Sequence, residues 1–344
     1  MPRSTIDDVA ALAGVSIKTV SRVVNREPNV RHSTRERVEA AIAELNYRPN
    51  RSARSLARRR SQLIVLVYDD PSLYDAPSAG YIVRLQEGAL RACRDSGYEL
   101  LIHPCNYRDK EIRTELRSLI EQARPDGLVL AAPISNIDRI VDGIAETGVP
   151  FVRLSPGDAG QDGLAIGTDD QEVSAAMTCH LAALGHRRIG FIAGNPAHRA
   201  VGNRLPGYRD GLRRSGLEFA KELVARGDNS IASGEAAAET LLALADPPTA
   251  IFAANDDMAA GVLRVAYRHG LRVPGQLSVA GFDDSALARQ VYPALTTIRQ
   301  PLASMAEQAA RALTGLKNGA APPGGSRVVP SSLEIRDSTG PAPA

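Results

Sequence analysis

Residues 16–25 of this chain read Ser16-Ile17-Lys18-Thr19-Val20-Ser21-Arg22-Val23-Val24-Asn25. The three valines recur at spacings of three and four residues, which predicts a short helix with one apolar face. Its outward face carries Ile17, Lys18, Ser21, Arg22 and Asn25. Because serine oxygens accept hydrogen bonds from the first free amides of a helix, Ser16 is placed to cap it.

A second short helix is expected just before this one, over residues 6–13. Thr5 can cap it, and Asp8 stands three residues later, as a capping box requires. Val9, Leu12 and Ala13 form its expected buried stripe. Gly14 and Val15 leave room only for a tight turn between the two helices, and this helix-turn-helix pattern places its second helix in the major groove of DNA. A small helical hairpin with a solvated charged face is the alternative interpretation.

A third helix is expected to begin at a Ser33 cap, with Glu36 three residues on. Its apolar stripe is Val38, Ala41, Ile42 and Leu45. The three helices together could bury a small core, although a unit of this size has only marginal stability.

Charge is distributed unevenly along the 344 residues, whose formal net charge is +2. Residues 1–60 hold 13 Lys and Arg against 6 Asp and Glu, and the remainder holds 28 against 33. A basic front part indicates a polyanionic partner. Residues 50–60 are rich in arginine, so they are expected to fold only when phosphates neutralise them. Leu56, their one large apolar residue, fits a wedge between base steps in the minor groove; a flexible linker is the alternative.

From Leu63 onward the pattern alternates between strands and helices. The near-continuous apolar run 63–67 is typical of a parallel strand that is covered on both faces. Repeated strand–helix units, in two series separated near Gly167, predict an α/β protein with two doubly wound sheets. The expected strands are 63–67, 99–103, 127–131, 151–154, 189–193, 223–225, 250–253 and 277–280. The expected helices are 82–96, 111–122, 137–146, 177–184, 205–214, 233–244, 258–268 and 302–316.

Polar side chains follow several of these strands. Ligands of doubly wound folds bind outside the carboxyl ends of the strands. The candidate ligand-binding residues are Asp70, Tyr74, Ser155, Arg204, Asn255, Asp257 and Asp283. Carboxylates, amides and an arginine suit the vicinal hydroxyls of a sugar, because hydroxyls both donate and accept. Asp256 and Asp284 have an equally good alternative as caps of the helices that follow them.

Several function classes find no support. The nucleotide-binding glycine motifs and the nucleophile elbow of hydrolases are absent, so we expect neither an enzyme nor a cofactor, and no catalytic residue is assigned. The histidines lack metal-ligand spacing, so no metal is expected. Cys93, Cys105 and Cys179 are typical of free thiols in a reducing compartment. No signal peptide or membrane span is recognisable, which predicts a cytoplasmic protein without a membrane partner.

The motifs resemble the LacI family of bacterial repressors over nearly the whole chain. The resemblance rests on 5–10, 14–16, 19–25, 43–50 and Ala57, and on Arg-x-x-Gly-Tyr from Arg204, Ala-Asn-Asp from Ala254 and Gly-Phe-Asp-Asp from Gly281. It implies that Ile17, Lys18 and Arg22 read bases, while Thr5, Ser16, Thr19, Ser21 and Asn25 position the helix on phosphates. It also implies a hinge helix over 50–58 that binds DNA through Asn50, Ala53 and Leu56. Asn229 stands where relatives often carry an aromatic platform for a sugar.

The resemblance further implies a three-helix helix-turn-helix headpiece and two Rossmann-like lobes of periplasmic-binding-protein type. The implied divisions are a headpiece at 1–48, a linker at 49–61, a first lobe at 62–165 and 296–325, a second lobe at 166–295 and 326–337, and a disordered tail at 338–344. The expected partners are double-stranded operator DNA, a small-molecule effector and a second copy of the chain. A dimer suits a palindromic operator, and the ending lacks the leucine heptads of a tetramer. A sugar-controlled repressor is the leading hypothesis, and a regulator with a purine corepressor is the alternative.

Overall fold

The structure is a computed structural model that describes residues 4–24, 28–47, 60–70, 80–157, 163–316, 320, 322 and 324–343. The chain forms two compact units, Met1–Ser61 and Gln62–Ala344, called here the head and the body. Five predicted site residues lie outside the described residues: Asn25, Asn50, Ala53, Leu56 and Tyr74. The predicted hinge helix over 50–58 lies outside them as well.

The head contains the three predicted helices, α1 (Ile6–Ala13), α2 (Ile17–Val24) and α3 (His32–Glu44). Thr5 and Asp8 form the predicted capping box of α1. Gly14 ends that helix with a φ of 63°, a left-handed conformation that costs glycine little. The Thr19 amide donates to Ser16 Oγ over 3.2 Å, which confirms the predicted cap of α2. The buried core of the head is Val9, Ala10, Ala13, Val20, Val23, Val38, Ala41 and Tyr47.

Two details of the predicted head are wrong. Leu12 is 47% exposed, because α1 turns Val9, Ala10 and Ala13 toward the core instead. The third helix begins two residues earlier than predicted, with Arg31 at its N-cap and no side-chain cap hydrogen bond. Ser33 therefore lies inside the first turn and does not cap the helix.

The first lobe of the body is built on a six-stranded sheet in the order β11-β5-β4-β3-β1-β2, in which every paired strand is parallel. Its strands are β1 (Leu63–Asp69), β2 (Glu99–Cys105), β3 (Gly127–Leu130), β4 (Phe151–Leu154), β5 (Leu164–Gly167) and β11 (Gly325–Val328). Its helices are α5 (Gly80–Ser96), α6 (Ile112–Ala123), α7 (Asp138–Ala145) and α14 (Leu302–Thr314), with the 3-10 turn η2 (Ile134–Asn136).

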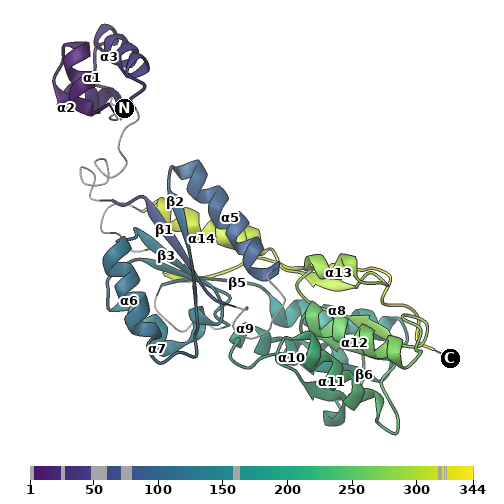
Figure 1. The fold of residues 1–344 in the computed structure, drawn as a ribbon. Helices are drawn as coiled ribbons and strands as arrows, with labels where there is room; N and C mark the ends of the chain where they lie inside the picture. The colour runs from purple at the N-terminus through teal and green to yellow at the C-terminus, as the bar shows by residue number, and fades with distance from the viewer. Residues whose placement is uncertain are drawn as a thin grey trace. The chain divides into compact units, whose positions relative to one another are not determined.

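The continuous apolar run of β1 contributes buried side chains to both faces of this sheet. Ile64 and Leu66 pack with α5 and α14 on one face. Val65 and Val67 pack with α6 and α7 on the other. Figure 1 shows α5 beside α14 and α6 beside α7. Because successive side chains of a strand alternate between faces, a strand covered on both sides needs apolar residues at every position, as predicted.

The second lobe repeats this construction on a smaller, parallel sheet in the order β7-β6-β8-β9. Its strands are β6 (Ile189–Ala193), β7 (Val224–Arg226), β8 (Ala250–Ala253) and β9 (Ser278–Ala280). Its helices are α8 (Asp170–Ala183), α9 (Arg199–Gly202), α10 (Arg204–Arg214), α11 (Ile231–Leu242), α12 (Asp256–Arg268) and α13 (Ala286–Gln290), with the 3-10 turn η3 (Lys221–Leu223). None of the described helices combines the length and the hydrophobicity that a bilayer span requires.

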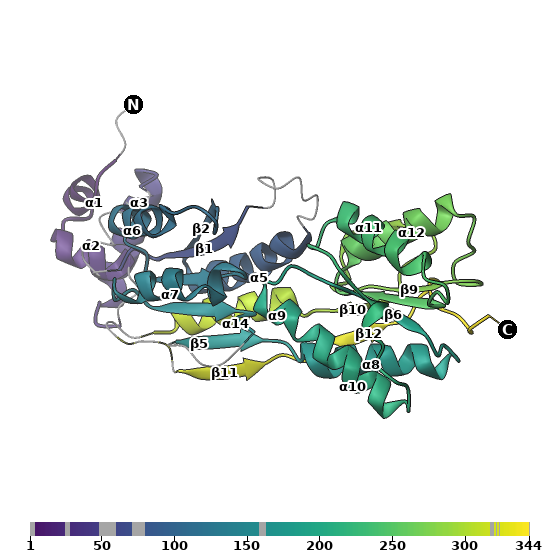
Figure 2. The ribbon, with the colours of Figure 1, turned by 90° about the horizontal axis from the view of Figure 1, so that it is seen from below.

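Three connections join the two lobes. The first follows β5, the second runs through β10 (Thr297–Arg299), and the third joins β11 to β12 (Ser332–Glu334). The strands β10 and β12 pair with each other, antiparallel, between the lobes (Figure 2). Two predicted boundaries are displaced: β5 continues past residue 165, and β11 pairs with it, so residues 326–328 belong to the first lobe.

The predicted disordered tail is instead packed on the second lobe. Ser338 is fully buried, and its hydroxyl donates to the carbonyl of Val279 over 2.6 Å. The Gly340 amide donates to Ser278 Oγ, and the Ala342 amide donates to the carbonyl of Leu184. The Pro/Ala/Gly composition indicated disorder, but these hydrogen bonds fix 338–343 beside β9.

Candidate functional site

The head presents the predicted DNA-binding residues in two environments. Ile17 is 47% exposed, and Lys18 and Ser16 are exposed, so they are available to a ligand. Thr19, Ser21 and Arg22 are partly buried. The Thr5 hydroxyl donates to Asp8 Oδ2 over 2.8 Å within the capping box, so this residue also stabilises α1.

A cavity of about 400 Å3 opens among the loops of the body. Both lobes line it. The first-lobe residues are Asp69, Tyr81, Ile82, Tyr107, Arg108, Ala132 and Ser155. The others are Asn195, His198, Ala200, Val201, Arg204, Asp228, Asn229, Ser230, Asn255, Asp257, Asp283 and Gln300. This size suits a small organic ligand.

Five of the predicted ligand-binding residues meet at this cavity: Ser155, Arg204, Asn255, Asp257 and Asp283. Asp70 does not line it, and Asp69 does. The reason is that β1 extends two residues beyond the predicted end, to Asp69, while the amide of Asp70 bonds to the carbonyl of Cys105 on β2.

Arg204 is the most enclosed charge at the cavity, with a side chain that is 5% exposed. Its Nε donates to Asp170 Oδ2 over 3.0 Å, and its Nη1 donates to the carbonyl of Ala254. The guanidinium lies 3.6 Å from the centre of the Phe282 ring and 3.8 Å from Asp283 Oδ1. These contacts fix the arginine before any ligand is present.

Asn255 is equally constrained. Its Oδ1 accepts from the Met258 amide and caps α12, while its Nδ2 donates to the carbonyl of Asn229 over 2.9 Å. Asp256 is therefore not the cap of α12: its carboxylate accepts from the Thr297 hydroxyl and the Ser285 amide. Burial raises the pKa of Asp256 well above its ordinary value, and the neighbouring charge of Asp283 adds to the rise.

Asp283 is an electrostatically strained carboxyl group. Burial raises its pKa to about 7; Arg204 and a hydrogen bond from Gln300 oppose the rise, while Asp257 and Asp170 add to it. Its φ is 119°, and Ser155 and Asn229 also have positive φ values, of 48° and 77°. Residues held in this region of backbone space gather at functional sites, so the geometry marks this cavity as a candidate site.

The first-lobe wall differs. The hydroxyls of Tyr81 and Ser155 are buried at the cavity, and neither makes a hydrogen bond of ordinary geometry within the described residues. Burial raises the pKa of Tyr81 to about 12, so its hydroxyl stays protonated at neutral pH and can donate.

The sequence did not single out several other lining residues. They are Asn195, His198, Asp228, Gln300, Tyr81, Tyr107 and Arg108. Burial, assisted by the charge of Arg204, lowers the pKa of His198 to about 4, so this ring is neutral at physiological pH. No group of three His, Cys, Asp or Glu side chains within the described ranges is arranged to hold a metal.

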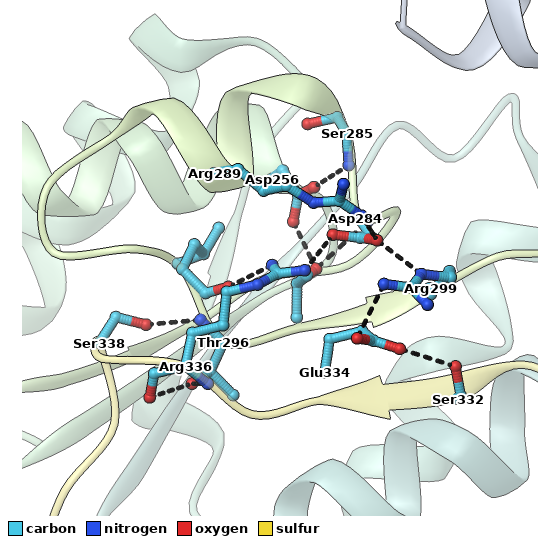
Figure 3. A network of polar contacts seen from close by, with 12 residues as sticks. Asp256, Asp284, Ser285, Arg289, Thr296, Arg299, Ser332, Glu334, Arg336 and Ser338 are labelled. Carbon is cyan, nitrogen blue, oxygen red and sulfur yellow. Dashed lines mark hydrogen bonds and ion pairs between the residues drawn. The ribbon is translucent and has the colours of Figure 1, made fainter.

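Asp284, next to Asp283, forms a separate network (Figure 3). It does not cap α13. Its fully buried carboxylate binds Arg289, Arg299 and Arg336, at 2.8, 2.7 and 2.5 Å. Burial alone would raise the pKa of Asp284, but these three hydrogen bonds outweigh it and hold the pKa below its ordinary value. Arg299 lies on β10 and also pairs with Glu334 on β12, so the network joins the second lobe to the connecting strands.

A helix-turn-helix head with a basic outer face, followed by two parallel-sheet lobes around a ligand-sized cavity, defines the class of ligand-controlled transcriptional regulators. Two family models match the chain: "Bacterial regulatory proteins, lacI family" over residues 5–50, and "Periplasmic binding protein-like domain" over residues 178–339. The chain belongs to the LacI family of bacterial transcriptional regulators.

Individual relatives support this assignment. The transcriptional regulator GalR of Escherichia coli is 36% identical over 308 residues, which cover 89% of this chain and 87% of GalR. A solved structure of the Lac repressor dimer, bound to operator and the anti-inducer ONPF, has a TM-score of 0.83 at 32% identity and covers 98% of this chain and all of that one. A CelR–cellobiose complex has a TM-score of 0.72 at 32% identity with the same coverage. The chain is thus similar to regulators rather than to enzymes.

Proposed function

We propose that this protein is a dimeric repressor that binds a palindromic operator and is controlled by a small molecule in the cavity between its lobes. The cavity carries the proposal, because it is lined by both lobes and its second-lobe wall is already fixed by hydrogen bonds. A ligand that contacts both walls binds the closed lobes better than the open ones. Such differential binding is what shifts a two-state equilibrium.

On the DNA side, Ile17, Lys18 and Arg22 read base edges in the major groove. Thr5, Ser16, Thr19, Ser21 and Asn25 hold the head on phosphates and the sugar backbone. Asn50, Ala53 and Leu56 contact the minor groove once the segment after the head has folded on DNA. The exposure of Ile17 and Lys18 on α2 supports the first of these roles.

The chemistry of the cavity favours an uncharged polyhydroxylated effector, such as a sugar. Four carboxylates line it, at Asp69, Asp228, Asp257 and Asp283. Of the two lining arginines, Arg204 already pairs with Asp170, and Arg108 is exposed. Among the described lining residues, a phosphorylated or carboxylated ligand would face four like charges and two arginines, of which the buried one already has a carboxylate partner, whereas sugar hydroxyls can donate to the carboxylates. A similar complex, CelR with cellobiose, contains a ligand of this kind.

A thermal-shift screen with neutral sugars, nucleosides and purine bases would identify the effector. A ligand at a hundred times its dissociation constant stabilises the folded protein by about 2.7 kcal/mol. A purine hit would favour the corepressor alternative, in which the ligand raises operator affinity. No stabilisation by any of these compounds, together with stabilisation by a sugar phosphate, would contradict the proposed effector class.

The minor-groove role of Leu56 has its own test. Leu56→Ala should weaken binding to a selected palindromic site far more than binding to random duplex, because only the folded segment inserts the leucine. Gel-shift titrations at one salt concentration would compare the two duplexes. If the variant lost equal affinity for both duplexes, Leu56 would not act as a minor-groove wedge.

A further inference from the structure

Along residues 195–204 of the second lobe, residues that line the cavity alternate with residues that bond to the first lobe. Five of them line the cavity: Asn195, His198, Ala200, Val201 and Arg204. Three of the residues between them bond to the first lobe: Ala197, Arg199 and Asn203. We call this stretch the bridging segment. It consists of a loop, the short helix α9 and the first residue of α10.

The bonds from the bridging segment reach three places in the first lobe. Arg199 Nη2 lies 3.2 Å from Asp138 Oδ1, at the start of α7. Asn136 Nδ2 donates to the carbonyl of Ala197 over 2.9 Å. Asn203 Nδ2 donates to the carbonyl of Gly157 over 3.2 Å. Because all three cross from lobe to lobe, any rigid separation of the lobes breaks them.

Gly157 adds evidence that the two lobes are built to meet here. Its φ is +82°, and a Cβ at this position would lie 2.5 Å from Arg199 Cβ and 2.7 Å from the Ala200 amide nitrogen. Only glycine allows this backbone of the first lobe to approach the bridging segment so closely.

A second contact between the lobes is of a different kind. Arg84 Nη2 on α5 donates to the carbonyl of Asp284 over 3.3 Å. The carboxylate of Asp284 binds Arg299 on the connecting strand β10 and Arg336, which follows the connecting strand β12 (Figure 3). A buried charge network next to the covalent connections suits a hinge, while an exposed ion pair with two partly buried hydrogen bonds suits a closure that forms and breaks.

We propose that Arg199 and Asp138 form a latch that holds the two lobes closed over the cavity, with Asn136 and Asn203 reinforcing it. A ligand that contacts His198 or Arg204 acts on the same ten residues that carry the latch, so occupation of the cavity and closure of the lobes are coupled. This inference rests on the proposed ligand-binding role of the cavity. Arg199 does not line the cavity, so in this proposal it acts on the ligand only by positioning the two lobes.

The expected effect is moderate. The side chains of Arg199 and Asp138 are 40% and 58% exposed, so solvent screens their attraction. An exposed pair of this kind changes an equilibrium by at most about fivefold, which corresponds to ~1 kcal/mol. High salt should weaken the latch further.

Resonance energy transfer between labels on the two lobes would test the latch. Labels at Glu121→Cys on α6 and Glu218→Cys after α10 would be placed in a Cys179→Ser background, because Cys93 and Cys105 are buried and Cys179 is only partly so. Excess unlabelled protein would keep labelled chains apart in any dimer. The full chain would be used without DNA, so a negative result on the latch would leave the proposed function standing.

Arg199→Glu and Asp138→Arg should each raise the open population about fivefold, and the double variant, which restores opposite charges, should close the lobes again. Gly157→Ala should open them with the ion pair chemically intact. The matched control is Arg188→Ala, which removes a 3.0 Å pair with Asp246 inside the second lobe and should change nothing between lobes. The proposal would be overturned if the energy-transfer efficiency were unchanged in the single variants, or if the double variant opened the lobes by the sum of the two single effects. If Arg199→Glu unfolds the protein, Arg199→Gln takes its place.

Discussion

Two buried hydroxyls of the first lobe line the cavity without a hydrogen bond of ordinary geometry in the described part of the chain, whereas the buried charged and amide groups of the second lobe already have partners. Tyr81 and Ser155 represent the first kind, and Arg204 and Asn255 the second. Both lobes have the same doubly wound construction, so the difference comes from the loops. The second lobe is therefore the fixed half of the site, and the first lobe retains hydrogen-bonding capacity for a ligand.

The largest expected effect comes from breaking the fixed half. Arg204→Ala leaves the Asp170 carboxylate, 3% exposed, without its cation, and should lower the free energy of unfolding by about 3–5 kcal/mol. Urea denaturation of the full chain measures this. Arg108→Ala, at an exposed position on the same cavity, is the matched control and should stay within about 0.5 kcal/mol. A small loss in Arg204→Ala would mean that the second-lobe wall is not preorganised by this pair.

Asp284→Asn should come next, with a loss of about 2 kcal/mol, because hydrogen bonds to charged groups contribute roughly 1.5–3 kcal/mol. The folded pKa of Asp284 is depressed, so the stability that it contributes is present above pH 3.8 and is lost as the pH falls below that value. The variant and the parent should therefore converge in acid. Denaturation curves at pH 7 and pH 3 would compare them; a constant gap across this range would contradict the ionic role.

Asp283→Asn should have the opposite sign. The pKa of Asp283 is raised from 3.8 to about 7 by burial, so the folded state holds a proton that the unfolded state releases between these values. Stability then falls as the pH rises from about 4 to 7, and the amide variant lacks this fall. At pH 8 the variant should be more stable than the parent, by about 1–4 kcal/mol, and at pH 4 the two should agree. If the variant were less stable than the parent at pH 8, the contacts of ionised Asp283 with Arg204 and Gln300 would outweigh the cost of its burial, which would contradict this prediction.

The smallest effect on stability should come from the first lobe. Tyr81→Phe removes a buried hydroxyl that makes no hydrogen bond of ordinary geometry with the residues that the structure describes, so the free energy of unfolding should change by less than about 0.5 kcal/mol. If the hydroxyl serves the ligand, affinity for the effector should fall about tenfold, as one lost hydrogen bond implies. Calorimetry with the ligand from the thermal-shift screen measures this. Unchanged affinity would contradict the proposal that the first-lobe hydroxyls bind the ligand.

Local signals predicted most of the fold. The bounds of α1 and its capping box follow from residues three positions apart, and the strand β8 follows from one apolar run. The same reasoning found Ser155, Asn255 and Asp283, because each comes within three residues of the end of a strand. It judged 338–343 by composition, and it could not see that their hydrogen-bond partners lie 42 or more residues away, as for Ser338 and Thr296.

Long-range contacts account for what the sequence could not reveal at the site. Asp170 and Arg204 stand 34 residues apart without a shared motif, and Arg199 and Asp138 stand 61 apart on different lobes. Gln300 reaches Asp283 only after the chain has crossed between lobes. Such pairs leave no periodicity or spacing in the sequence, so they become visible only in the folded structure.

Operator affinity with and without the cavity ligand tests the central claim most directly. The full chain would be used to select duplexes from a random library. The affinity of the selected site would then be measured by fluorescence anisotropy at fixed salt. The account predicts a palindromic site whose affinity changes about 5–150-fold at saturating ligand, with the reciprocal change in ligand affinity when the site is bound. Equal operator affinity at zero and saturating ligand, or no preference for any site, would contradict it.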